Sequence, residues 1–204
     1  LAGVFVWRMA FRASVLRMLA SFGRSRFVRA GIAAVFRVLA LALLTSDPAL
    51  ASTVGDQDQP ALARATDGGF LVVWRRYPGG VRAQRYDATG TPVGTERVVS
   101  PDSSSDRDPA VARLRDGRFL VVWQRFGTGV VARVLDAAGV PQGRDIAITT
   151  SVAGGGLDLA INDKGRGLVI WTGDDGDYAG IFARRLRTNG MPRDASFQVN
   201  TYTT

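Results

Sequence analysis

The chain has 204 residues and a formal net charge of +8, with 26 Lys and Arg against 18 Asp and Glu, but neither cysteine nor histidine. This composition excludes disulfide bonds and catalytic systems built on a Ser-His-Asp or Cys-His pair. Seven arginines and one acid, Asp47, lie in residues 1–51, so this segment carries +6 and the remainder +2. The basic character therefore predicts no nucleic-acid partner.

Residues 1–51 have the order of an N-terminal leader. The arginines are followed by the apolar run 38–44, by Pro48 and by Ala49-Leu50-Ala51 before Ser52. This order predicts a helical signal peptide that is cleaved after Ala51, which leaves no membrane span and sends the protein to the periplasm, the cell surface or the medium. A membrane anchor is one alternative, although the mostly apolar stretch 30–44 is about 15 residues long and a span needs roughly 20. An organelle-import leader is another.

Residues 52–204 contain one sequence unit three times. The segment DGGFLVVW at 67–74 returns as DGRFLVVW at 116–123 and, more divergent, as KGRGLVIW at 164–171. The tryptophans at 74, 123 and 171 are therefore 49 and 48 residues apart. A fixed period of this size indicates a repeat architecture, with repeats at about 58–100, 106–150 and 157–200.

Each repeat predicts four short strands joined by tight turns. Strands alternate with Gly-rich turns, and an Asp-Gly pair, 67–68 or 116–117, joins the first two strands as a hairpin. The second strand is apolar on both faces, so we expect neighbouring sheets to cover it on both sides. In repeat one the predicted strands are 60–65, 70–74, 81–86 and 96–100.

This pattern predicts an all-β fold, a β-propeller-like array of three four-stranded blades. The large residues at the repeated strand positions are expected to form the core between blades: Phe70, Trp74, Phe119, Trp123 and Trp171. Complete propellers have four to eight blades. We therefore expect either a fragment of a larger protein or a chain that needs further blades or self-association to close.

The repeats resemble a known family. The resemblance is carried by Pro60-Ala61-Leu62-Ala63, by residues 67–74, by AQRYDATG at 83–90 and by Val199-Asn200-Thr201. These motifs are similar to tandem blade-type repeats of large secreted bacterial proteins, which often stand near hemolysin-type calcium-binding or adhesin-like modules. The resemblance covers residues 58–201 and implies a β-propeller in an exported protein, without a settled activity.

One acidic loop has the character of a metal site. Between Trp171 and Gly180 the third repeat has three more residues than the others, and the loop contains Asp174, Asp175 and Asp177. Carboxylates on a Gly-containing loop suit Ca²⁺. The alternative is a solvated turn, because the spacing matches neither the twelve-residue calcium loop nor the nonapeptide calcium repeat. No other cofactor is predicted.

The sequence predicts a non-catalytic binding or scaffolding module, with an extracellular protein or a glycan as partner and with no catalytic residues. The longest loop, 172–178, would be its contact surface. The alternative is a carbohydrate-active enzyme domain, a glycosidase or lyase that uses carboxylates and tyrosine and needs no histidine. Arginines 75, 76, 82 and 85 are expected on a solvated outer face.

Overall fold

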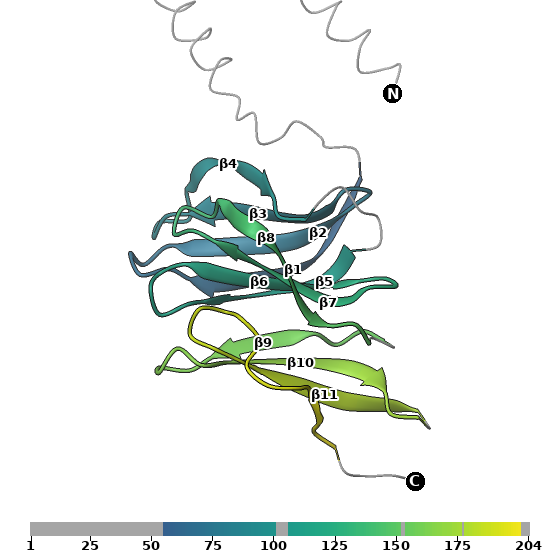
Figure 1. Cartoon of the computed structure of the whole chain (residues 1–204). Coiled ribbons are helices and arrows are strands. Elements are labelled where there is room, and N and C mark those ends of the chain that lie inside the picture. Colours follow the sequence, from purple (N-terminus) through teal and green to yellow (C-terminus); the bar gives the residue numbers. More distant parts are fainter. Residues whose placement is uncertain (1–54, 101–105, 152–153, 177, 201–204) are drawn as a thin grey trace, which may run out of the picture. The chain divides into compact units, whose positions relative to one another are not determined.

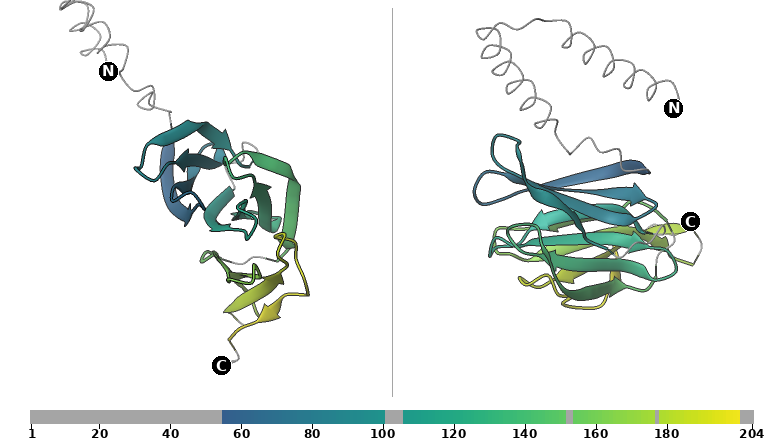
Figure 2. Two further views of the ribbon diagram at one scale, coloured as in Figure 1. Left: turned by 90° about the vertical axis from the view of Figure 1, so that its left-hand side faces the viewer. Right: turned by 90° about the horizontal axis from the view of Figure 1, so that it is seen from above.

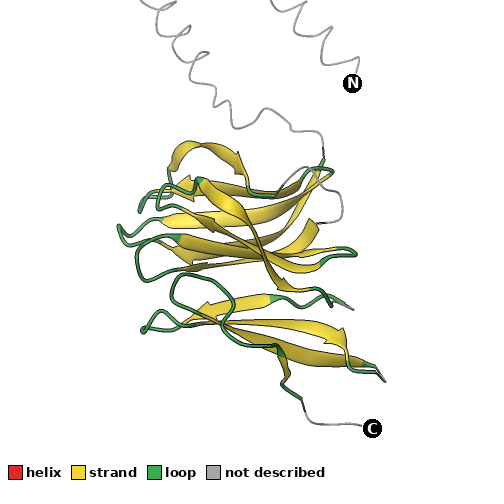
Figure 3. Ribbon diagram, in the orientation of Figure 1, coloured by secondary structure: helices red, strands yellow, loops and turns green. Residues whose placement is uncertain are grey.

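The computed structural model describes residues 55–100, 106–151, 154–176 and 178–200, and the predicted leader lies outside them. The described part is all-β, with strands in three sheets and no helix (Figures 1 and 3). Among these residues there is consequently no helix with the length and apolar character that a membrane crossing requires.

Each repeat forms one four-stranded antiparallel sheet with the strands in sequence order. The first blade contains β1 (Asp56–Arg64), β2 (Phe70–Tyr77), β3 (Gly80–Tyr86) and β4 (Pro92–Val98). The second contains β5 (Asp106–Arg113), β6 (Phe119–Arg125), β7 (Gly129–Leu135) and β8 (Pro141–Thr149). The third contains β9 (Asp158–Ile161), β10 (Gly167–Asp174), β11 (Ala179–Leu186) and β12 (Phe197–Gln198). The predicted array of three four-stranded blades is confirmed.

The hairpin between the first two strands of each blade has a local cause. The Asp67 carboxylate accepts a hydrogen bond from the backbone N–H of Gly69 at 3.1 Å, and Gly68 takes a φ of +86°. Asp116 accepts from the N–H of Arg118 in the second blade at 3.2 Å. A short side-chain acceptor followed by glycine closes this turn without strain, which is why the Asp-Gly pair marks it in the sequence.

The core lies between blades. Leu71, Val73 and Val81 of the first blade share a buried cluster with Phe119 and Trp123 of the second. A second cluster joins the second blade to the third, and Figure 2 shows the three sheets following one another in chain order. Burial between sheets therefore holds the repeats together, as expected of stacked units.

The predicted core aromatics have different environments. Phe119, Trp123 and Trp171 are buried, whereas Phe70 and Trp74 are only half-buried. The two half-buried side chains belong to the first blade, whose outward face has no described blade against it. The tryptophan of each blade packs towards the preceding blade, so the first tryptophan lacks that cover.

Strands β1, β5 and β9 form the inner edges of the blades. β1 contacts β5, and β5 contacts β9, although none of them pairs with another in a sheet. The opposite edges are β4, β8 and β12. Residues at the start of the inner strands therefore come together from different repeats.

Candidate functional site

A backbone irregularity recurs at the start of two inner strands. The strand register shifts between Asp58 and Ala61 in β1, and between Arg107 and Ala110 in β5. At these bulges Gln59 has a φ of +52° and Asp108 a φ of +50°, the positive-φ residues other than glycine in the described part of the chain. Such conformations are costly and are concentrated at functional sites.

The two strained residues bind each other across the blade interface. The Gln59 Nε2 donates to Asp108 Oδ1 at 2.7 Å, and the backbone N–H of Asp108 donates to Gln59 Oε1 at 2.9 Å. Asp108 Oδ2 points towards the segment before β9, since a Cβ added at Gly155 would lie 3.4 Å from it. The bulge of the second blade therefore lies against β1 of the first blade and against the segment before β9 of the third.

An arginine lies among the inner-strand carboxylates. Arg75 on β2 donates to both oxygens of Asp58, at 2.7 and 2.5 Å. These hydrogen bonds lower the pKa of Asp58 and raise that of Arg75, which the charges of Asp108 and Asp56 raise further. Asp58 is thereby held ionised. We call Asp58, Gln59, Arg75 and Asp108 the bulge site.

A second group of carboxylates at this end forms ion pairs with arginines. Arg125 donates to the buried Asp106 at 2.9 and 3.1 Å and to Asp145 at 2.9 Å, and Arg133 also pairs with Asp145. The pKa of Arg125 is raised, first by the hydrogen bond with Asp106. Because both carboxylates form ion pairs with arginines, we interpret this network as structural.

A pocket of about 270 Å³ adjoins the bulge of the second blade. Arg107 and Arg125 form one side of it, and the turn that carries Phe126 forms the other. Gln124 in its wall is buried, and its Nε2 has no hydrogen-bond partner among the described residues. A buried donor without a partner is costly unless a ligand or water accepts from it. We call this hollow the turn pocket.

Exposed aromatic side chains gather at the same end of the blades. Tyr77, Phe126 and Tyr178 are 48%, 77% and 80% exposed. Each lies at the turn between the second and third strands of its blade. Aromatic side chains with one apolar face and one wet end are enriched at interfaces.

Two of the three predicted calcium ligands, Asp174 and Asp175, lie among the described residues. Asp174 Oδ1 accepts from the N–H of Gly176 at 2.9 Å, and Asp175 Oδ1 accepts from that of Tyr178 at 3.0 Å. Asp177 lies outside the described residues. Among the described residues no group of three or more His, Cys, Asp or Glu converges to hold a metal ion. The two described carboxylates shape a turn, and a calcium ion here stays a hypothesis.

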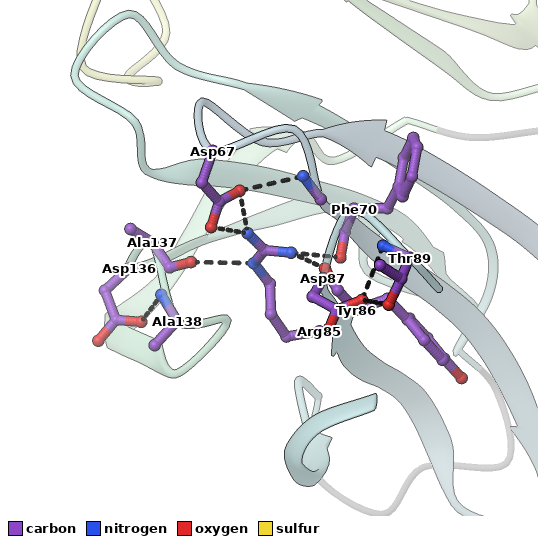
Figure 4. Close-up of polar contacts among 10 residues, drawn as sticks. Asp67, Phe70, Arg85, Tyr86, Asp87, Thr89, Asp136, Ala137 and Ala138 are labelled. Carbon is purple, nitrogen blue, oxygen red and sulfur yellow. Dashed lines mark hydrogen bonds and ion pairs between the residues drawn. The ribbon is translucent and has the colours of Figure 1, made fainter. Parts of the chain in front are cut away.

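Two of the four arginines expected on a solvated face are buried instead. Arg82 and Arg85 are each less than a tenth exposed. Arg85 donates to both oxygens of Asp67 at 2.6 and 2.7 Å, and to the carbonyl of Phe70 at 3.0 Å (Figure 4). It also reaches the carbonyl of Tyr86 and, across the blade interface, that of Ala137 at 3.3 Å. Its role is to join two blades.

Sequence reasoning did not find the bulge site or the exposed aromatics. A signal was present, because Gln59 and Asp108 each precede a proline at matching repeat positions, and Tyr77 and Phe126 each follow the repeat tryptophan by three residues. The side-chain pairing itself joins residues 49 positions apart. Its geometry depends on how the blades stack.

No family model and no curated protein matches the sequence. Among solved structures, an endo-arabinase from Bacteroides thetaiotaomicron matches with a TM-score of 0.53 and 12% identity, over 74% of this chain and 65% of that one. An α-L-arabinofuranosidase from Lactobacillus brevis matches with a TM-score of 0.48 and 13% identity, over 72% of this chain and 55% of that one. The chain thus spans less than two thirds of either enzyme.

The similarity supports a propeller-like repeat fold and does not support the resemblance to hemolysin-associated or adhesin-like proteins. It also corrects the predicted function. One solved structure with this fold is an endo-arabinase, and on this finding the prediction of a non-catalytic binding or scaffolding module is wrong. The alternative derived from the sequence, a carbohydrate-active enzyme domain on a propeller scaffold, is favoured instead.

Proposed function

We propose that the described array is the substrate-binding and catalytic part of a glycosidase that acts on a polysaccharide. The observation that carries this proposal is Asp108. It is held at a strained φ by the second-blade bulge, with Oδ1 fixed by Gln59 and without a described hydrogen bond to Oδ2. A fixed carboxylate with one open oxygen at a site of backbone strain is suited to proton transfer.

Glycoside hydrolysis needs two carboxyl groups on opposite sides of the bond that is cleaved. Asp158 opens β9, the inner strand next to β5, and is exposed at the same end of the blades. We assign Asp108 and Asp158 as this pair, one protonating the leaving oxygen and the other acting on the sugar carbon or on a water. Asp58, held ionised by Arg75, supplies negative charge near the positive charge that develops on the sugar ring.

The surrounding residues suit a sugar polymer. The apolar faces of sugar rings pack on aromatic side chains, and Tyr77, Phe126 and Tyr178 offer such faces at successive blades. Sugar hydroxyls accept from donors such as the guanidinium of Arg107, which lines the turn pocket. The activity of the similar endo-arabinase makes arabinan the first substrate to test.

The test is release of reducing sugar from arabinan, together with cleavage of a chromogenic arabinofuranoside. Asp108→Asn and Asp158→Asn should each lower kcat by about 10²–10⁴-fold, the usual contribution of a general acid or base. Asp163→Asn, at an exposed turn of the third blade, is the matched control and should retain the parental rate. A parental rate in Asp108→Asn, or no cleavage of any arabinan or arabinofuranoside by the chain, would overturn the proposal.

The proposal includes export, since a polymeric substrate lies outside the cell. It is supported by the arginine-rich leader and the Ala49-Leu50-Ala51 segment before Ser52. N-terminal sequencing of protein recovered from the periplasm or the medium should give Ser52 as the first residue. Recovery of uncleaved protein in the cytosol alone would contradict it.

A further inference from the structure

The outward face of the third blade carries apolar side chains that the other two blades bury. Leu168, Ile181 and Val199 are 38%, 39% and 51% exposed. Their repeat counterparts are all fully buried: Leu120, Val130 and Ile148 in the second blade, and Leu71, Val81 and Val99 in the first. The third blade thus presents the same kind of face that a following blade covers in the other two.

The outward face of the first blade is the opposite half of such an interface. Leu62 is 63% exposed, whereas its counterparts Val111 and Leu159 are buried against the preceding blade. Phe70 and Trp74 are half-buried where Phe119 and Trp123 are buried. One chain therefore carries both halves of the blade interface, each uncovered.

A contact between glycine and leucine recurs at both described interfaces. The outer turn of each blade packs on the preceding one, so that a Cβ added at Gly139 would lie 2.9 Å from Leu71 Cδ1, and one at Gly190 would lie 3.0 Å from Leu120 Cδ1. Gly90 is their counterpart in the first blade. Its φ of +84° matches theirs, yet no described atom lies within 4 Å of its added Cβ.

The matching leucine is exposed on the third blade. Leu168 is the counterpart of Leu71 and Leu120, and it lies beside a hollow of about 350 Å³ that Arg185 also lines. Arg185 occupies the position of Arg85, which donates across the first interface to the carbonyl of Ala137. The hollow adjoins the leucine position on which an outer turn packs at the other two interfaces, and the turn that contains Gly90 is the uncovered counterpart of those turns.

We propose that the third blade of one chain docks on the first blade of a second copy, and that two such interfaces close a ring of six blades. In this arrangement Gly90 of the second copy sits on Leu168, and the carbonyl of Ala88 accepts from Arg185 as that of Ala137 does from Arg85. Complementary halves on one chain make a head-to-tail contact, which forms a closed ring when the rotation closes. Six blades lie within the four to eight of known propellers.

One recurring contact is absent from this interface. Arg133 of the second blade donates to the carbonyl of Val99 in the first, and Arg184 of the third blade donates to the carbonyl of Ile148 in the second. On the third blade the corresponding acceptor is the carbonyl of Val199. Gln84 stands at the position of these arginines in the first blade, and its amide already donates to the carbonyls of Arg85 and Val93. The contact between copies is thus weaker than the contacts within a chain, and we expect the ring to dissociate on dilution.

The mass of the full chain in solution tests the proposal. Light scattering over a range of concentrations should give twice the 21.8 kDa of one chain at the upper end. Leu168→Arg and Leu62→Arg alter exposed side chains on the two faces and should each give single chains with an unchanged circular dichroism spectrum. Phe126→Arg, which alters a more exposed apolar residue at a turn away from both faces, is the control and should stay paired.

Mixing the two single-chain variants identifies the contact as head-to-tail. The Leu168→Arg chain keeps an intact first blade, and the Leu62→Arg chain keeps an intact third blade. In the mixture these two unaltered blades can dock, so pairs of one variant with the other should form through a single native interface. Pairing that persists in Leu62→Arg would indicate a contact between two third blades and would overturn the proposal. A wild-type chain that stays single at every concentration would overturn it too.

Discussion

Arg85 shows how a single residue joins two repeats. Its guanidinium is buried and donates to the Asp67 carboxylate, to two carbonyls of its own blade and to Ala137 in the next. In the sequence it stands in a strand with alternating polar residues, a pattern typical of a solvated face. Its five donors, rather than its charge alone, explain why burial is tolerated here.

Removing this guanidinium should destabilise the stack. Arg85→Met leaves buried carbonyl acceptors without a donor, so we expect a loss of about 1–3 kcal/mol in the free energy of unfolding. Urea unfolding followed by circular dichroism measures this difference. Arg64→Met, at an exposed position of β1, is the control and should leave the urea concentration at the unfolding midpoint unchanged. Equal midpoints for the two variants would show that Arg85 contributes nothing to stability.

The aspartates with lowered pKa values predict acid sensitivity. The pKa of Asp58 is lowered by hydrogen bonds from Arg75, that of Asp67 by the N–H of Gly69 and by Arg85, and that of Asp116 by Arg118. Because each folded pKa lies below the unfolded value, the unfolded chain binds protons first as the pH falls. The stability that these groups contribute is therefore present at neutral pH and is lost below about pH 5.

Urea midpoints between pH 7 and pH 3 test this dependence. The parent should hold a constant midpoint near neutrality and lose stability steeply in acid. A variant with Asp58, Asp67 and Asp116 all changed to Asn should lose less stability between pH 5 and pH 3, because it lacks three of the groups that titrate. Parallel curves for parent and variant would contradict the assignment.

The burial of a strand depends on which blades pack against it. β6 is covered on both faces and all of its residues from Phe119 to Gln124 are buried, whereas β2, with nearly the same sequence, is alternately buried and half-buried. The two strands differ in what packs against them rather than in their own composition. A repeat sequence therefore predicts the strand but not how fully it is covered.

This difference predicts unequal costs for the same substitution. In the Leu168→Arg background, where no second copy docks, Trp123→Ala should cost about 3–5 kcal/mol, the range for a buried large aromatic. Trp74→Ala should cost clearly less, because its side chain is only half-buried. Chemical unfolding of the two variants measures both. Equal costs would mean that Trp74 is covered as fully as Trp123.

Stability should also vary across the whole described array. The second blade is packed between the other two, while the third ends in β12, which has two exposed residues. Local opening is easiest where burial is least. Hydrogen exchange should therefore be slowest in β6 and β7 and fastest in β12. The Leu168→Arg variant should show faster exchange than the parent in the first and third blades, whose outward faces lose the cover of the second copy, and uniform protection along the chain would contradict this account.

The sequence by itself determined the period, the strands and the hairpins, because these depend on local chemistry. An Asp-Gly pair closes its own turn, and an alternating or doubly apolar run of five residues is a strand wherever it stands. The all-β class and the three blades therefore follow from the residues alone. Even the difference in loop length that singles out residues 172–178 can be counted in the sequence.

Only the tertiary structure decided what the blades bring together. The pair of Gln59 and Asp108, the reach of Arg85 to Ala137 and the gathering of Tyr77, Phe126 and Tyr178 join residues from different repeats. Their contacts depend on the offset between stacked sheets, which no period along the chain encodes. The same holds for the uncovered faces of the first and third blades, since leucine precedes valine at one repeat position in all three blades, yet it is buried in the first two and exposed in the third.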